Sequence, residues 1–259
     1  MRWSCLFAVS AASLFAQLPT PNAAGISMGH VHLIVKDPEA QEKLWVDVLG
    51  AEPSKAGPLT LLKLPGIFII VSKGEPMGGS NGSVVNHVGF LVKSYADIKA
   101  RLMANNIKLL VDSAQNKQII AEFPEEVRVE FNEDPSISAP VIMHHMHLFV
   151  ADPAAERDWY VKTFGAVATT RRNLPAAAIP GGEVDFLKSN TPTAPSKGRS
   201  IDHIGFEVKN LQAFCDRLKA DGVTFDSPYR EVPQLDLKIA FVLDPAGTRI
   251  ELTEGLVAH

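Results

Sequence analysis

Apolar and polar residues alternate along residues 29–36 and again along residues 143–151, and both stretches run into an Asp-Pro pair. Alternation with a period of two predicts a half-buried β-strand, and Asp followed by Pro is typical of the start of a helix. Gly50 and Gly165 stand where C-terminal glycines end such helices. Short strands are predicted after each helix, including residues 67–71 and 183–187.

A second strand and helix are predicted to begin near His87 and again near His203. Each of these helices carries a single apolar stripe, which predicts one buried face. A last strand bears Glu130 in one copy and Glu251 in the other, so the chain is predicted to hold four β-α-β-β-β units. The stripes are Tyr95, Ile98 and Leu102 in the first copy and Leu211, Phe214 and Leu218 in the second.

The two halves of the chain repeat the same residues in the same order. His30 and His32 recur 115 positions later as His145 and His147. Self-similarity of this kind identifies a repeat architecture. Further matches relate residues 86–90 to residues 202–206, and residues 128–131 to residues 249–252.

The size of the chain agrees with two domains. It has 259 residues, of which 46% are hydrophobic, and this is enough for two cores of ordinary size. We predict two domains, at residues 28–134 and 142–255, with a linker at residues 135–141 that Pro135 and Pro140 stiffen.

Charge and hydropathy exclude two classes of partner. The net charge of -4 leaves no basic surface for neutralising phosphates, so nucleic acid is not an expected partner. Beyond the N-terminus the chain has no apolar run of 18 residues, so no membrane association is expected once a leader has been removed.

The N-terminus differs from the rest of the chain. Arg2 precedes a stretch of apolar and small residues at 6–16, and polar and Pro-rich residues follow at 17–22. This order fits a secretory signal peptide, so we predict a leader at residues 1–24 and a secreted or periplasmic protein. A true start at Met28 would make the protein cytoplasmic.

Strand parity separates the polar residues from the core. His30 and His32 point to one face of their strand, and Val31 points to the other. The apolar face must pack under the helices, so the histidines face away from the core. In the last strand Arg249 and Glu251 share a face by the same argument.

If the sheets curve, two histidines and a glutamate from each repeat can converge in a concavity. Two neutral imidazoles and a carboxylate leave coordination positions open on a divalent ion. Such a site suits Fe or Mn, and with a fourth ligand it suits Zn or Ni. The predicted groups are His145, His203 and Glu251 in the second repeat, and His30, His87 and Glu130 in the first.

The motifs resemble the vicinal oxygen chelate superfamily, which includes glyoxalase I, extradiol dioxygenases and bleomycin-resistance proteins. The resemblance rests on the Asp-Pro that follows each histidine strand, on His-Ile-Gly-Phe-Glu-Val at residues 203–208, and on residues 244–252. It implies an α+β fold in which paired βαβββ units form curved mixed sheets around a metal ion. It also implies a small-molecule substrate that binds the metal through two vicinal oxygens.

Glyoxalase-like members use four protein ligands, and the resemblance places the additional one at Asp185 in the second repeat and at Ile69 in the first. Isoleucine cannot bind a metal, so the second repeat is the better candidate for a complete site. Residues on the same faces as the ligands are candidates for binding substrate, with the arginines suited to a carboxylate. These residues are His32, His147, Arg128 and Arg249.

The function expected from this set is isomerase or lyase chemistry, in which a metal polarises the substrate and Glu251 moves a proton. One alternative is an extradiol Fe(II) dioxygenase, although Phe241 stands where those enzymes carry a tyrosine. Another is a protein that binds a small ligand without catalysis, as resistance proteins do. Four units can pair within one chain, so a monomer suffices, and a homodimer is the alternative.

Overall fold

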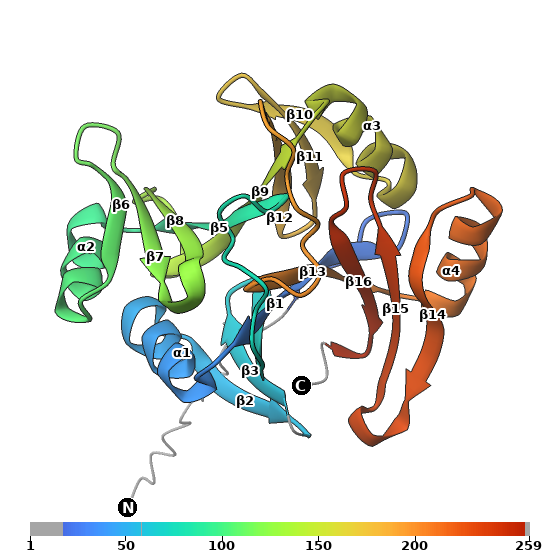
Figure 1. Ribbon diagram of the computed structural model, residues 1–259, viewed down its shortest axis with the longest axis horizontal. Helices are drawn as coiled ribbons and strands as arrows, with labels where there is room; N and C mark the ends of the chain where they lie inside the picture. Colours follow the sequence, from blue (N-terminus) through green and yellow to red (C-terminus); the bar gives the residue numbers. More distant parts are fainter. Residues whose placement is uncertain (1–17, 58, 257–259) are drawn as a thin grey trace, which may run out of the picture.

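The computed structural model describes residues 18–57 and 59–256, which form two eight-stranded mixed sheets (Figure 1). Most of the predicted leader therefore lies outside the described residues. The fold is α+β with four βαβββ units, as the sequence predicts. We number the units 1 to 4 in chain order, at residues 26–73, 85–133, 141–188 and 201–254.

Units 1 and 4 form one sheet, which we call the outer-unit sheet. Its central strands β1 and β13 pair antiparallel. The strands, in spatial order, are β14 (Phe225–Val232), β15 (Leu237–Leu243), β16 (Arg249–Glu254), β13 (Ile201–Val208), β1 (Ile26–Val35), β4 (Ile67–Lys73), β3 (Leu59–Leu64) and β2 (Glu52–Ala56).

Units 2 and 3 form the other sheet, the inner-unit sheet, around the antiparallel pair β5 and β9. Each sheet therefore takes one unit from each sequence repeat. The strands, in spatial order, are β10 (Val167–Arg171), β11 (Leu174–Ile179), β12 (Gly182–Lys188), β9 (Val141–Val150), β5 (Val85–Val92), β8 (Val127–Glu133), β7 (Gln118–Phe123) and β6 (Lys108–Ser113).

The helices begin and end where the sequence predicts. Asp37 and Asp152 cap helices through their side chains, and Gly50 and Gly165 end the same segments with φ of 74° and 63°. Figure 1 shows α2 and α4 at opposite ends of the molecule. The helical segments are α1 (Pro38–Leu44), which continues as the π-helix η2 (Trp45–Leu49), α2 (Tyr95–Ala104), η3 (Pro124–Glu126), α3 (Pro153–Phe164), α4 (Leu211–Ala220) and η4 (Pro233–Leu235).

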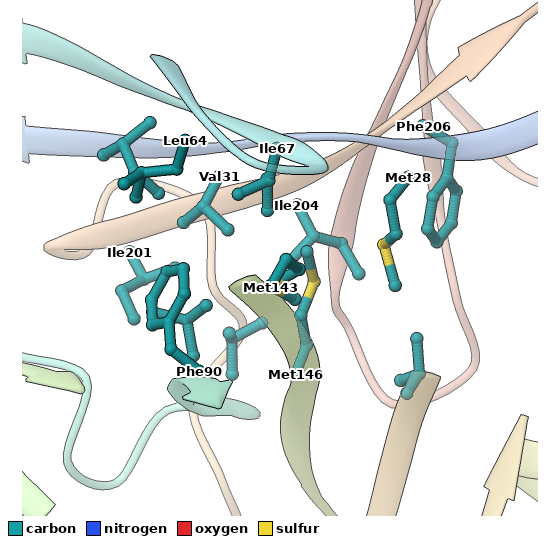
Figure 2. Packing of buried hydrophobic residues seen from close by; sticks show 14 of the residues in the cluster. Met28, Val31, Leu64, Ile67, Phe90, Met143, Met146, Ile201, Ile204 and Phe206 are labelled. Carbon is teal, nitrogen blue, oxygen red and sulfur yellow. The ribbon is translucent and has the colours of Figure 1, made fainter. Parts of the chain in front are cut away.

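The main core lies between the two sheets. Val31 and Ile204 of the outer-unit sheet face Met146 and Phe90 of the inner-unit sheet, and all four are buried (Figure 2). Strand parity therefore has the predicted result, because the residues that alternate with the histidines enter this core. No helix within the described residues is long and apolar enough to cross a membrane.

A pair of buried acids joins unit 3 to unit 4. Glu156 of α3 is 5% exposed and lies beside Asp244, which follows β15. Asp244 accepts hydrogen bonds from the Tyr160 hydroxyl at 2.9 Å and from the Thr248 amide at 2.6 Å. Burial and the neighbouring Asp244 charge raise the pKa of Glu156 to about 8, so this side chain keeps its proton at neutral pH.

Glu156→Gln is expected to flatten the dependence of stability on pH. A folded-state pKa raised to about 8 gives stability that is present below the ordinary pKa of 4.5 and is lost as pH rises through about 8. Between these values the wild type should lose roughly 1 to 3 kcal/mol relative to the variant. Urea unfolding at several pH values measures this, with the exposed Glu39→Gln as control; parallel curves for wild type and Glu156→Gln would contradict it.

Candidate metal centres

Three histidines and a glutamate meet on the concave face of the outer-unit sheet. His30 and His32 come from β1, His203 from β13 and Glu251 from β16, and one side-chain N or O atom of each lies within 4.8 Å of the others. Oε2 of Glu251 lies 3.0 Å from Nε2 of His30 and 2.8 Å from Nε2 of His203. Nε2 of His32 lies 2.7 Å from Oγ of Ser72. We call His30, His32, His203 and Glu251 together the outer group.

The inner-unit sheet holds a matching set, the inner group, made of His87, Glu130, His145 and His147. Oε2 of Glu130 lies 2.8 Å from Nε2 of His87 and 3.4 Å from Nε2 of His145. Nδ1 of His147 lies 2.9 Å from Nε2 of His87. Both groups are thus formed by the first strands of two units and the last strand of one.

The members of each group come from different repeats, which corrects the predicted grouping. His203 and Glu251 lie with His30 rather than with His145, and His145 lies with His87 and Glu130. The reason is the strand pairing: β1 lies beside β13 of unit 4, whereas β5, the second half of its own repeat, belongs to the other sheet. The predicted residues converge, but in the exchanged combination.

A glycine on the neighbouring strand makes room for the first histidine of each group. A Cβ atom at Gly205 would overlap the His30 ring, and one at Gly89 would overlap the His145 ring. Each glycine belongs to the His-x-Gly-Phe motif of the other repeat. The motif glycine is thus explained by close approach of a ligand side chain, a role that the sequence analysis did not assign.

Asp185 lies outside the inner group, because its carboxylate pairs with Arg171. Burial raises the pKa of Asp185 to about 6 despite this arginine. The predicted equivalence of Asp185 with Ile69 is wrong by one residue. Asp185 lies opposite His147 in the parallel register, and the residue opposite His32 is Ile70; Ile69 faces the main core.

Burial and hydrogen bonding together set the protonation states of His30, His32 and Glu251 in the outer group. Burial lowers the pKa of His30 and takes that of His32 to about 3, so both rings are neutral. Burial opposes ionisation of Glu251, but hydrogen bonds from His203 and His30 outweigh it and hold its pKa well below the usual range. His30 and His32 therefore offer neutral imidazoles and Glu251 offers an ionised carboxylate, the forms that bind metals.

The two groups differ in the residue that precedes the histidine of the His-x-Gly-Phe motif, which is His203 in the outer group and His87 in the inner group. Asp202 accepts a hydrogen bond from Nδ1 of His203, whereas the matching partner of His87 is the neutral amide of Asn86, at 2.9 Å. Burial acts against protonation of His203, but hydrogen bonds to Asp202 and Glu251 raise its pKa. A carboxylate behind a histidine orients the ring and makes its other nitrogen a stronger ligand. Sequence analysis missed both residues, although each stands next to a predicted ligand.

The predicted arginines have protein partners. Arg249 donates to Asp202 at 2.8 Å and to Asp226 at 2.9 Å, and its guanidinium lies over the Phe241 ring. Arg128 has its Nε atom 3.7 Å from a carboxylate oxygen of Glu122. Arg249 lines the cavity above the outer group, and so it remains a candidate for binding substrate.

A cavity of about 550 Å³ opens onto the outer group, a volume typical of small-molecule sites. His32, His203 and Glu251 line it. Oε1 of Glu251 has no hydrogen bond within the described residues, whereas Oε1 of Glu130 accepts from Gln118 at 2.7 Å and from Asn132 at 2.8 Å. The carboxylate of the outer group thus has a free oxygen, and that of the inner group has none.

Both groups fit a divalent ion. Metal–ligand bonds of about 2.1 Å require ligand atoms about 3 to 4 Å apart, close to the spacings present. Three buried ring nitrogens have no hydrogen-bond partner in the described structure, which is costly for buried polar groups unless another ligand satisfies them. These atoms are Nδ1 of His30, Nε2 of His145 and Nε2 of His147.

Residues 142–252 match the family model described as the Glyoxalase/Bleomycin resistance protein/Dioxygenase superfamily. Glyoxalase I from Zea mays is similar over 90% of this chain and 94% of its own, with a TM-score of 0.69 at 14% identity. A putative dioxygenase from Bacillus subtilis is similar over 92% of this chain and 86% of its own, with a TM-score of 0.68 at 14% identity. At such identities the likeness is one of fold. A search of curated protein sequences gave no match.

Gly205→Ala is expected to lower the free energy of unfolding by about 1 to 3 kcal/mol, because the new methyl group displaces the His30 ring. The same substitution should cost little in a His30→Ala background and its full amount in a His145→Ala background. Denaturant unfolding of these variants measures the coupling. Equal costs in the two backgrounds would show that the ring over Gly205 is not that of His30.

Proposed function

We propose that this chain, of which residues 142–252 match the model of the glyoxalase, bleomycin resistance protein and dioxygenase superfamily, is a divalent-metal enzyme that transfers a proton on a small oxygen-chelating substrate. The observation that carries the proposal is the outer group at the cavity. Two imidazoles and a carboxylate converge there, and one carboxylate oxygen is free. This is isomerase or lyase chemistry of the glyoxalase or epimerase kind.

His30, His203 and Glu251 would hold the metal, and His32 is close enough to complete the set. Two imidazoles and a carboxylate suit Fe, Mn, Zn or Ni. When bound, such an ion polarises a carbonyl and stabilises the negative charge that develops on its oxygen. Asp202 would keep the proton of His203 on Nδ1, so that Nε2 faces the site.

Glu251 is the candidate base. Its Oε2 atom is engaged by the two histidines, and its Oε1 atom is left for a substrate proton. The hydrogen bonds from the two histidines lower its pKa and keep it ionised at neutral pH, the form in which its Oε1 atom can face a substrate proton. His32, neutral and one pleat away, lines the same cavity and can donate a hydrogen bond to a substrate oxygen.

The reaction is assigned to the outer group alone. The matching oxygen of Glu130 is held by two amide donors, so the inner group has no carboxylate oxygen available as a base. We propose that the inner group binds a metal for stability. A purely sequestering protein would need neither the ionised carboxylate nor the Asp202 support, and these features favour catalysis.

Two double variants test which residues bind the same metal ion. His30→Ala with Glu251→Gln alters one group, and we expect this double variant to lose one of two metal equivalents. His30→Ala with Glu130→Gln alters both groups and should lose both equivalents. Elemental analysis after metal loading measures this, with Glu39→Gln as an unrelated control. Full metal content in both double variants would refute metal binding at these groups.

Glu251→Gln is expected to slow proton exchange on α-hydroxy ketones by about 10² to 10⁴-fold, since general bases contribute this much. Exchange of the α-proton in D₂O, followed by NMR at saturating Mn(II) or Zn(II), measures the rate. Glu130→Gln is the matched control and should leave the rate near that of the wild type. Exchange that survives Glu251→Gln at full metal occupancy would remove this glutamate as the base. Oxygen uptake with catechols that depends on Glu251 would instead favour the dioxygenase.

A further inference from the structure

The two metal-ligand groups lie in concave faces of opposite chemical character, which strand register allows us to compare position by position. Phe241 lies opposite Glu251, where the inner-unit sheet has Ile120 opposite Glu130. Two residues along the same strands, Ile239 matches the polar Gln118. One strand face thus changes from wholly apolar in the outer-unit sheet to partly polar in the inner-unit sheet.

The other half of each concave face differs more strongly. Opposite the first histidine of each group, Phe68 of the outer-unit sheet replaces Glu183 of the inner-unit sheet. Ile70 lies opposite His32, where the inner-unit sheet has Asp185 opposite His147. At the last residue of the edge strand, the outer-unit sheet has Ala56 in β2 and the inner-unit sheet has Arg171 in β10.

The polar residues of the inner-unit face pair with one another. Arg171 pairs with Asp185 and lies 3.2 Å from Glu183, and Arg172 donates to Asn132 at 2.9 Å. Ion pairs and amides therefore occupy the space around the inner group. An apolar ligand would have to displace these contacts and leave buried charges unpaired, which is costly.

The apolar residues of the outer-unit face form a hydrophobic cluster separate from the main core, and we call it the apolar wall. Much of it lines the 550 Å³ cavity, and Leu18, Leu59 and Leu235 pack against it. An apolar wall on an open cavity beside convergent polar groups is typical of a ligand site. The lining members of the apolar wall are Ile70, Val232, Leu237, Ile239, Phe241 and Leu256.

Three charged residues of the cavity lie toward solvent. Lys73, Glu75 and Arg230 line it and are exposed, while the apolar wall is buried to 8% exposure or less. A ligand would therefore meet the metal-binding group, the Asp202–Arg249 ion pair and the apolar wall in the interior, and the exposed charges at the rim.

We propose that the substrate of the outer group carries an apolar substituent of several carbon atoms next to its oxygen-chelating head. The head would bind at His30, His203 and Glu251, and the substituent would lie on the apolar wall between Ile70 and Ile239. This inference rests on the proposed metal-dependent function for the head alone. The inner-unit face, lined by ion pairs, takes no such ligand.

Alkyl hydroxamates test the inference, because they chelate a metal through two oxygens and can be lengthened one methylene at a time. Calorimetric titration of the Mn(II)-loaded full chain should give a dissociation constant that falls roughly fourfold per methylene from the two-carbon to the eight-carbon probe. The increments should end when the apolar wall is filled.

Variants of the apolar wall show where the alkyl chain of the probe binds. Ile239→Gln places the inner-unit residue on the outer-unit face and should weaken the eight-carbon probe at least about tenfold, while the two-carbon probe changes less than about twofold. Val232→Thr, which is nearly isosteric, should reduce the increments without disturbing the fold. Gln118→Ile is the matched control on the inner-unit face and should change neither probe.

The outcomes separate the two proposals. If neither metal nor the two-carbon probe binds, the metal-dependent function is wrong. If both bind but affinity does not depend on chain length, or Ile239→Gln leaves the increments unchanged, the apolar substituent is wrong and the metal-dependent function stands.

Discussion

The antiparallel pairing of β1 with β13, repeated by β5 with β9, is the contact on which both candidate metal sites depend. It sets His30 over Gly205 and His145 over Gly89, where a side chain larger than hydrogen would collide with the imidazole. The pairing also buries the opposite faces of the same strands between the sheets. One set of backbone hydrogen bonds thus positions the ligands, and the hydrophobic contacts behind it fix the register, because a slip by one residue would turn the histidines into the core.

Most ligand residues could be predicted from the sequence, because strand parity and the repeat are local properties. His30, His203 and Glu251 each alternate with core residues, and this alternation is visible without a structure. Their partners could not be predicted, because both repeats carry the same motif and β1 fits beside β5 or β13 by local pattern equally well. The misplacement of Ile69 has a related cause. The offset between the repeats changes from 115 at His30 to 116 at His87, and the strand between them was assigned the wrong value.

Divergence between the two sites is concentrated in the residues that contact the ligands. Asp202 stands where the inner group has Asn86, and Ile239 stands where it has Gln118. The exchange of Asn86 for Asp202 places a charged group behind His203. The exchange of Gln118 for Ile239 removes a hydrogen-bond donor to the glutamate and makes the neighbouring surface apolar. The repeated scaffold thus has the same arrangement of histidines and glutamate at both sites, whereas the residues around these side chains differ. Asn86 and Asp202 begin the matched segments, whereas Gln118 and Ile239 lie outside them, and the sequence alone does not show that any of these residues contacts a member of the two groups.

The unit pairing has a consequence for how the chain is made. The inner-unit sheet is formed by a continuous segment, residues 85–188, whereas the outer-unit sheet joins the first unit to the last. During synthesis from the N-terminus, unit 1 must wait with its β1 edge unpaired until residues 201–208 emerge. Contacts of such long sequence separation form slowly, and exposed strand edges favour aggregation. The inner-unit sheet, whose sequence is complete earlier, offers a surface on which the apolar face of β1 can be covered before β13 has been made.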